Sequence, residues 1–368
     1  MKVAYYIGSL NRGGAEMLLL DICRKKNCAP FEMILIYRNE GELSDCFRST
    51  GVPMFRIKPK GLKIGYLFCL RKFLKRERIE VLHAHTLTNA VIGVVVTMFA
   101  KVRLVATFHG FYRSWIKTLY RHVVIWNADA MVFVSEDLRE WYLKHSLLCP
   151  PRHCYVVYNG INFSKLDKKY PIPGFLVKSK EDKNVTVQLA MVGNFTGVRS
   201  QIVVCRGIKL LKSQGYKNVT FYFIGKKVDA EPFFFDECVK YCIENEIMDM
   251  VHFVGSRGDV PAVLQHIDGF VYSSIRDSFG IAVVEALASG LPVVVNDWKV
   301  MVEIIRNREW VSFFRSNDEK DCCEKMKQLI DNLAVRKQLA LAFKEEVRNT
   351  YSIEEHIQNL NKVYEAVV

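Results

Sequence analysis

The stretch YSSIRDSFGIAVVEALASGLPVVVND, residues 272–297, combines two strand-like segments with a helix-like one. The apolar residues up to Val271 predict a short buried strand, and PVVV at residues 292–295 predicts another. Between them, Asp277 is a short acidic side chain typical of a helix start, and Gly290 with the proline after next marks the helix end. In open α/β sheets, a helix that starts at the carboxyl end of a strand is a common site for an anionic ligand.

The expected helix N-terminus, around residues 279–281, suits a phosphate group because Gly280 has no side chain that would keep a ligand from the backbone. Asp277 and Glu285 lie eight residues apart, just over two helical turns, so we expect them to project on roughly the same side. Glu285 stands in an apolar run, where a carboxylate needs partners. Those partners are either ligand hydroxyls or a nearby basic side chain on a plain amphipathic helix, and the spacing leaves both open.

Length and composition indicate a globular protein of 368 residues, half of them hydrophobic, which is enough for two ordinary α/β domains. The formal net charge is +13, and residues 1–150 hold 23 Lys and Arg against 12 Asp and Glu. Such a basic half predicts contact with anionic lipid or an anionic acceptor. We expect no nucleic-acid partner, because no known nucleic-acid-binding motif is present.

The 11 cysteines are odd in number and form no C-x-x-C pair, so we expect neither a disulfide framework nor a structural zinc site, and we infer a reducing cytosol. The start of the chain lacks the form of a signal peptide. The longest apolar stretch, residues 90–100, is too short to span a bilayer. We therefore expect a cytoplasmic protein, either soluble or peripheral on the inner face of the membrane.

Further along the chain, strands and helices are expected to alternate, with a helix at residues 40–49, helical segments from residue 298 to 348, and a last helix at residues 352–366. Two of the expected helices are basic. The one at residues 67–78 is either a surface helix packed on a sheet or a helix beside anionic lipid. The aromatic and basic run at residues 111–124 leaves the same two alternatives.

Histidines follow two expected strands. VLHAH places His83 and His85 at the end of one strand, and the strand at residues 104–108 ends at His109. Histidines at strand ends are poorly placed to fill a core and well placed for a cleft. A zinc site is conceivable, but no carboxylate or cysteine has the spacing to complete it.

The motif DSFGIAVVEALASGLPVV resembles the signature of retaining glycosyltransferases of family 4, which have the GT-B fold. Three further motifs appear in the family's order, namely GGAE at residues 13–16, HAH with TFHG at residues 83–110, and VVYNGIN at residues 156–162. The resemblance covers nearly the whole chain. The family's first acid is usually Glu, and here it is Asp277.

The resemblance implies a nucleotide-diphosphate sugar, UDP- or GDP-linked, as co-substrate, with no cofactor and no metal. By the same resemblance, His109 faces the donor sugar, Asp277 holds its hydroxyls, Glu285 holds the nucleotide ribose, and Arg199 contacts the diphosphate. The remaining predicted donor-site residues are Gly13, Gly14, Asn194, Lys226, Ser278, Phe279, Gly280 and Ile281, with Val254 and Gly255 against the nucleobase.

One position of the expected diphosphate clamp differs from the family. The loop GNFTGVRSQ, residues 193–201, has Asn194 where the family has a first cation, and Arg199 where it has the second. Arg199 can contact a phosphate in bidentate fashion by itself. Lys226 or Lys227, after the expected strand at residues 220–225, could supply the missing charge.

The fold class implied is α/β, GT-B, with two doubly wound Rossmann-like domains facing each other across a cleft. We assign residues 1–165 to an acceptor-side domain, 166–184 to a linker, 185–351 to a nucleotide-sugar domain, and 352–368 to a helix that crosses back. The implied function is retaining, metal-independent transfer to a glycan or lipid-linked acceptor. One alternative is a non-catalytic nucleotide-sugar-binding or scaffold protein of the same fold. Another is an epimerase or a phosphorylase of this fold, and the sequence gives no signal for either of these two.

Overall fold

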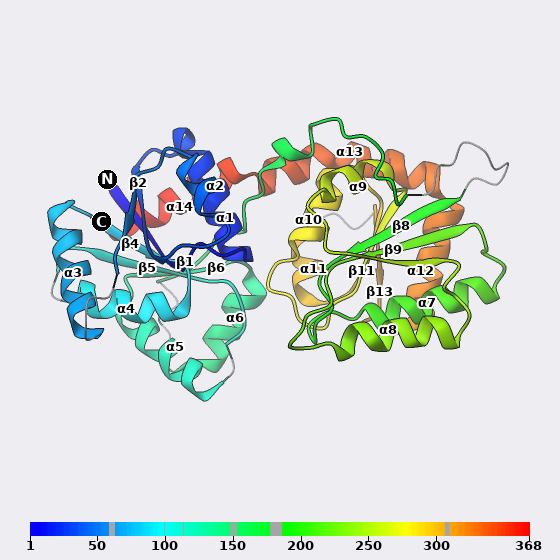
Figure 1. Cartoon of the computed structure of the whole chain (residues 1–368), viewed down its shortest axis with the longest axis horizontal. Coiled ribbons are helices and arrows are strands. Elements are labelled where there is room, and N and C mark those ends of the chain that lie inside the picture. Colours follow the sequence, from blue (N-terminus) through cyan, green and yellow to red (C-terminus); the bar gives the residue numbers. More distant parts are fainter. Residues whose placement is uncertain are drawn as a thin grey trace. The chain divides into compact units, whose positions relative to one another are not determined.

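The computed structural model describes residues 1–58, 63–98, 100–112, 114–147, 150, 153–176, 186–305 and 310–368. The chain divides into two compact units (Figure 1). Unit 1 comprises Met1–Asn162 and Tyr351–Val368, and unit 2 comprises Phe163–Thr350. Of the expected linker, residues 166–184, the part from residue 177 onward lies outside the described residues.

Unit 1 is built on a parallel seven-stranded sheet of order β3-β2-β1-β4-β5-β6-β7. Its central strands are buried on both faces and read as apolar runs, as parallel strands covered by helices do. The strands are β1 (Lys2–Ser9), β2 (Glu32–Asn39), β3 (Met54–Arg56), β4 (Val81–Ala84), β5 (Arg103–Phe108), β6 (Ala130–Phe133) and β7 (Cys154–Val156).

Helices cover both faces of this sheet, with α1 and α14 on one side and α4 and α5 on the other (Figure 1). Ser135 accepts a hydrogen bond from the backbone N–H of Leu138 and so caps α6, as its place in the sequence predicts. The helices are α1 (Gly14–Arg24), α2 (Ser44–Arg48), α3 (Lys63–Arg76), α4 (Leu87–Thr97), α5 (Trp115–Asn127), α6 (Glu136–His145) and α14 (Ile353–Val367).

The last helix, α14, packs into the core of unit 1. Its residues Ile353, Ile357, Leu360 and Val363 are buried together with β1, so the periodicity in the sequence corresponds to a real apolar face. The chain reaches this position through a short parallel bridge between Ile161 and Ser352. The terminal segment is therefore part of the folded core of unit 1 and not an appendage.

Unit 2 has a parallel six-stranded sheet of order β10-β9-β8-β11-β12-β13, with α7, α8 and α12 on one side and α9 and α10 on the other (Figure 1). The strands are β8 (Val187–Val192), β9 (Val219–Ile224), β10 (Val251–Gly255), β11 (Gly269–Tyr272), β12 (Val293–Asn296) and β13 (Val311–Phe314). The helices are α7 (Gln201–Ser213), α8 (Phe233–Glu244), α9 (Val260–His266), α10 (Ile281–Ala288), α11 (Lys299–Ile304), α12 (Glu319–Asp331) and α13 (Leu333–Tyr351).

Two sequence-based expectations are wrong in detail. The helix expected at residues 40–49 is only the short α2, because Leu43 and the residues before it form a turn closed by Ser44. The stretch after residue 297, expected to be helical, contains the edge strand β13, paired with β12. Within the described residues the cysteines form no disulfide, and no helix combines the length and apolarity needed to cross a membrane.

Candidate functional site

The sheet order of unit 2 defines a point where a ligand is expected. The chain runs outward from β8 to β9 and β10, then returns to place β11 on the other side of β8. At such a reversal the loops after the two central strands diverge and leave a crevice at their carboxyl ends. Here those loops are residues 193–200, after β8, and residues 273–280, after β11. Most of the predicted donor-site residues of unit 2 lie in these two loops.

Hydrogen bonds tie the two loops together. The N–H of Ser200 donates to the carbonyl of Ser273 (3.1 Å), and the N–H of Ile275 donates to the carbonyl of Val198 (3.1 Å). The hydroxyl of Ser274 also donates to Val198 O (2.8 Å). Because these groups are paired across the switch point, the two loops form one structural element.

Arg199 and Asp277, predicted as separate ligands of the donor, contact each other. Arg199 Nη1 lies 3.1 Å from Asp277 Oδ2, and the guanidinium lies 5.3 Å from the centre of the Tyr272 ring. The Tyr272 hydroxyl donates to the same Asp277 oxygen at 2.5 Å. Burial, with Asp277 nearby, raises the pKa of Tyr272 well above that of an exposed tyrosine, so it stays a proton donor. Asp277 therefore joins the two loops.

The start of α10 differs from the expectation. The helix begins at Ile281, and its cap is Gly280 at φ +88°, a left-handed conformation that favours glycine. Asp277 accepts hydrogen bonds from the N–H groups of Ser278 (2.9 Å) and Phe279 (3.4 Å), but it precedes the helix. The inference that Asp277 and Glu285 share a helix face is thus wrong, since only Glu285 is helical.

The other predicted residues around the start of α10 differ in how far their side chains are exposed. The Phe279 side chain is buried, whereas Ile281 is partly exposed. Glu285 is half-buried and lies one turn into α10. The exposed backbone at the beginning of a helix carries a partial positive charge that suits a phosphate.

Lys226 lies beside the loop after β8. Its N–H donates to Asn194 Oδ1 at 3.1 Å, so Asn194 acts as a hydrogen-bond acceptor where the family has a cation. Lys226 is exposed and has no ion pair with any described residue, whereas Lys227 is paired with Asp236 (2.6 Å). Of the two candidates for the second cation, Lys226 is the one whose charge remains available.

Close backbone packing positions these loops. A Cβ on Gly225 would lie 2.0 Å from the carbonyl oxygen of Gly193, so only glycine fits where β8 and β9 end. The N–H of Gly225 in turn donates to the carbonyl of Gly255 (2.9 Å), next to Val254 at the end of β10. The carboxyl ends of β10, β9, β8 and β11 thus form a continuous edge that holds the predicted donor-site residues.

In unit 1 the predicted residues also follow strands at the carboxyl edge. Gly13 is the N-cap of α1, and a Cβ there would lie 2.3 Å from a Glu16 carboxylate oxygen. Gly14 has open space around its Cα. His109 follows β5, and its ring stacks on that of His85 with centroids 5.7 Å apart. Gly13 and Gly14 lie at the start of α1, after β1, and His109 lies in the loop after β5, so they stand on opposite sides of the switch point between β1 and β4.

The histidines are more buried than strand-end residues were expected to be. His83 is fully buried and hydrogen-bonds to Tyr364 (2.6 Å) and Thr107 (2.7 Å), so the prediction of a cleft position is wrong for it. His85 is also buried. Burial lowers the pKa of His109 to about 4, with a smaller effect of His356, so its imidazole is neutral near pH 7. No group of three possible metal ligands occurs among the described residues, which include all three histidines.

Sequence reasoning missed the residues that hold the loop after β11. Asn296 is buried, accepts from the N–H of Ser274 (3.0 Å) and donates to its carbonyl (2.7 Å). Trp298 Nε1 donates to the carbonyl of Asp277 (3.2 Å). The polar Asn at the end of the apolar strand VVVN was the available signal, because a buried amide must find partners.

Comparison with known proteins covers both units. Residues 12–165 match glycosyltransferase family 4, and residues 176–349 match glycosyl transferases group 1. The chain is 24% identical over 326 residues to an N,N'-diacetylbacillosaminyl-diphospho-undecaprenol alpha-1,3-N-acetylgalactosaminyltransferase of Campylobacter jejuni, covering 82% of this chain and 81% of that protein. It is 24% identical over 282 residues to a UDP-Gal:alpha-D-GlcNAc-diphosphoundecaprenol alpha-1,3-galactosyltransferase of Escherichia coli, covering 73% and 72%.

Among solved structures, Anabaena HepE in complex with UDP and glucose superposes with a TM-score of 0.83 at 16% identity, covering 100% of both chains. WaaG, a glycosyltransferase involved in lipopolysaccharide biosynthesis, superposes with a TM-score of 0.68 at 14% identity, covering 100% of this chain and 99% of that one. These likenesses agree with the two parallel Rossmann-like sheets described above. The chain belongs to the GT-B glycosyltransferases of the family 4 type.

Proposed function

We propose that this glycosyltransferase moves a sugar, with retention of configuration and without a metal ion, from a nucleotide-diphosphate sugar to a lipid-linked or polysaccharide acceptor. Two relatives support the acceptor class, since their names specify diphosphoundecaprenol-linked acceptors. The complex of Anabaena HepE with UDP and glucose supports the donor class. The single observation that carries the proposal is the edge of unit 2 where Arg199, Lys226 and the start of α10 follow neighbouring strands.

The chemical task of this edge is to stabilise the diphosphate that leaves the sugar. Negative charge grows on the leaving phosphate as the bond to the sugar breaks, and fixed positive groups lower that barrier. Lys226 provides a cation without an ion pair, Arg199 provides a second cation that Asp277 offsets in part, and the backbone N–H groups at the start of α10 provide a partial positive charge. We assign the nucleotide ribose to Glu285 and the nucleobase to Val254 and Gly255.

For the retaining step, we propose that the departing phosphate oxygen takes the proton of the acceptor hydroxyl on the same face of the sugar. The acceptor oxygen then bonds to the anomeric carbon as the bond to the leaving oxygen breaks. This route needs no carboxylate nucleophile of the kind that retaining hydrolases use. Neutral His109 can hydrogen-bond a sugar hydroxyl without adding charge next to the cationic sugar.

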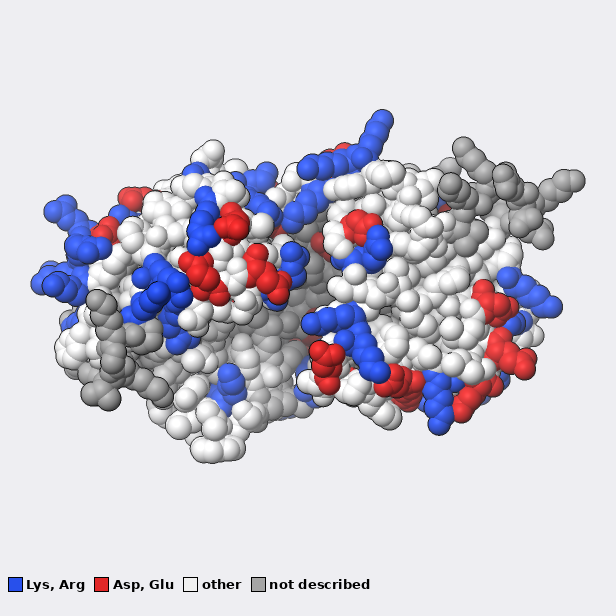
Figure 2. All heavy atoms as spheres, in the orientation of Figure 1, with Lys and Arg blue, Asp and Glu red and all other residues white. Residues whose placement is uncertain are grey.

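We assign the acceptor to unit 1 and propose that this unit attaches peripherally to the inner face of the membrane. Large apolar side chains are exposed on and near α5, with exposed fractions of 78% for Trp115, 57% for Leu119 and 56% for Trp126. Figure 2 shows Lys and Arg gathered over the end of unit 1 that carries α3. Aromatic side chains with neighbouring basic charges suit the boundary between lipid and water.

The donor proposal is tested by incubating the full chain with a panel of UDP- and GDP-sugars and following binding and slow hydrolysis by mass spectrometry. We expect one donor to be consumed, EDTA to leave the rate unchanged, and NMR to show that the anomeric configuration is retained. Binding of a donor without any consumption, with or without candidate acceptors, would instead indicate a non-catalytic binding protein.

Replacement of Glu285 tests the ribose assignment. Loss of two charge-assisted hydrogen bonds in Glu285→Ala should weaken donor binding by about 3–6 kcal/mol. Calorimetry measures this affinity, and circular dichroism checks that the fold is retained. Unchanged donor affinity in a folded Glu285→Ala variant would refute the assignment.

The membrane proposal is tested by sedimentation with vesicles of phosphatidylcholine, with and without phosphatidylglycerol, across a salt series. We expect binding to the anionic vesicles that weakens with salt, because exposed charges are screened over about 8–10 Å. Trp115→Ser with Leu119→Ser should reduce it, whereas Val335→Ser, at a residue of unit 2 with an exposed fraction of 58%, should not. Equal binding to both vesicle types would refute the electrostatic part of the proposal.

A further inference from the structure

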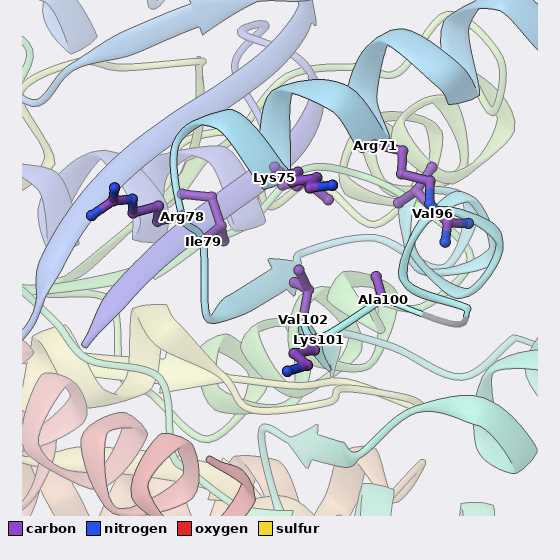
Figure 3. A pocket seen from close by; sticks show the side chains of 9 residues that line it. Arg71, Lys75, Arg78, Ile79, Val96, Ala100, Lys101 and Val102 are labelled. Atoms are coloured by element: carbon purple, nitrogen blue, oxygen red, sulfur yellow. The ribbon is translucent and has the colours of Figure 1, made fainter.

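A cavity of about 490 Å³ lies in unit 1, at the ends of α3 and α4 (Figure 3). Its lining includes Ile79, two residues before β4, and Val102, the residue before β5. It therefore lies at the amino edge of the sheet, whereas His109 follows β5 at the carboxyl edge. The six residues of β5 separate these edges by roughly 20 Å, at about 3.3 Å per residue. The cavity is thus distinct from the predicted catalytic residues.

Four basic residues line this cavity. Arg71, Lys75 and Arg78 come from α3 and the turn after it, and Lys101 comes from the segment that leads into β5 (Figure 3). Lys75, Arg78 and Lys101 are exposed and form no ion pair with a described residue. Their charges are therefore available to a ligand.

The nearest carboxylates in sequence are engaged elsewhere. Glu77 pairs with Arg76 (3.0 Å) and lies 3.8 Å from Lys2 Nζ. Glu80 accepts from the N–H of Lys2 (2.7 Å) and lies near the amino terminus. None of the residues that line the cavity is acidic, and Glu80 and Val368 line an adjoining cavity that shares Ala100 and Lys101 with it.

The partial negative charges of the two helix ends at the cavity do not cancel its positive charge either. The carboxyl ends of α3 and α4 both lie at the cavity, and each carries a partial charge of roughly −0.5 that basic residues commonly offset. Two such ends amount to about one negative charge, against the three exposed cations Lys75, Arg78 and Lys101. A positive excess of about two charges remains, which matches the charge of a phosphate dianion.

The floor of the cavity is apolar. Leu74, Ile79 and Val96 line it and are themselves buried. A volume of about 490 Å³ falls within the usual range for small-molecule sites, roughly 300–1,000 Å³. Cationic walls over an apolar floor match a phosphate group that carries a carbon-rich substituent, and they match bare inorganic phosphate less well.

We propose that this cavity is an accessory binding site for an organic phosphate, separate from the donor and acceptor sites. Two sources share that chemistry, namely the head group of an anionic phospholipid and a free phosphorylated metabolite. The inference does not rest on the proposed glycosyl transfer, because the site lies at the opposite edge of the sheet from His109 and its binding is measurable without turnover.

The test compares the full chain with two charge-matched double variants. Lys75→Gln with Lys101→Gln removes two charges from the cavity. Lys72→Gln with Lys144→Gln removes two exposed charges of unit 1 that do not line it. Calorimetry measures the affinity for glycerol 3-phosphate, and sedimentation measures binding to phosphatidylcholine vesicles with and without phosphatidylglycerol.

We expect the cavity variant to bind at least one of these probes at least about tenfold more weakly than the control variant, since each basic residue near an anion contributes about 1 kcal/mol. A loss confined to glycerol 3-phosphate identifies a free phosphorylated metabolite as the source, and a loss of vesicle binding identifies the lipid. The proposal is overturned if the cavity variant and the control variant have the same affinity for each probe, or if the wild-type chain binds neither probe.

Discussion

Removal of the Asp277 carboxylate tests whether this residue holds the donor-site loops together. In the Asp277→Ala variant, Arg199 loses its ion pair (3.1 Å) and the Tyr272 hydroxyl loses its acceptor (2.5 Å). The exposed fractions of the two charged side chains are 21% for Arg199 and 10% for Asp277, so water replaces little of what is lost. Breaking one partner of such a pair costs about 3–5 kcal/mol.

We therefore expect the free energy of unfolding of unit 2 to fall by about 3–5 kcal/mol in Asp277→Ala, and by about half as much in Asp277→Asn, which keeps oxygen and nitrogen atoms in place. Hydrogen–deuterium exchange of peptides from β8 and β11 in a urea series reports on unit 2 alone. The matched control is Asp236→Ala. Asp236 pairs with Lys227 at 2.6 Å, but the exposed fractions are 57% and 43%, so its loss should cost at most about 1 kcal/mol.

An equal loss of stability in Asp277→Ala and Asp236→Ala would refute the reasoning. It would mean that the buried pair contributes no more than a surface pair, and the role of Asp277 would then be confined to contact with the donor. If Asp277→Ala loses much more stability than Asp236→Ala, its activity has two explanations. Reduced transfer would then reflect disordered loops as well as any lost contact with sugar hydroxyls.

Three further changes have expected outcomes. Arg199→Ala should lower turnover more than Arg199→Lys in steady-state assays, because lysine keeps the charge but not the planar fork, and equal residual activity would count against a bidentate phosphate contact. Gly280→Ala should lower the thermal stability of unit 2 by about 1–2 kcal/mol in calorimetry, because alanine disfavours φ +88° and its Cβ would lie 2.6 Å from Met301 Cε. Acid should destabilise unit 1, because the pKa values of His109 and His356 are lowered to about 4 by burial while an unfolded histidine titrates near 6.5. Above about pH 6.5 both states hold neutral histidines and the free energy of unfolding is not affected. As the pH falls toward 4, the unfolded chain binds protons that the folded chain does not, so the free energy of unfolding is lower by about 2 kcal/mol for each histidine at pH 5. An unchanged urea midpoint between pH 7.5 and 5 would contradict this prediction.

The fold was predictable from the sequence because its signals are local. Apolar runs of four to eight residues bounded by glycine, proline or capping residues predict buried parallel strands, and they recur in both units. The edge strand β13 was missed because Val311–Phe314 is short and stands among helical segments. Such a segment is a strand only because β12 lies beside it, and that neighbour is not visible in a local pattern.

The candidate site was predictable in its position along the chain but not in its pairings. Loops after parallel strands converge at one edge, so the sequence places Arg199 and Asp277 in the same region. Their mutual ion pair, and the clasp that Asn296 forms on Ser274, depend on side-chain directions fixed by tertiary packing. The sequence suggested Asp277 as the opening residue of the helix, but the helix begins at Ile281 after the cap Gly280. The difference was not predictable, because a glycine with positive φ cannot be told from an ordinary helical glycine in the sequence.

Basic side chains of unit 1 lie at both edges of its sheet. At the carboxyl edge, Arg12 lies 3.9 Å from Glu42, whereas Arg38 donates to the neutral amide of Asn89 (3.2 Å) and keeps its charge. The nearby histidine His109 is neutral because burial lowers its pKa to about 4. At the amino edge, Lys75 and Lys101 have no ion-pair partner among the described residues. The basic excess of residues 1–150 is therefore shared between the two edges, and only the part that lines the cavity lies away from the predicted reaction site.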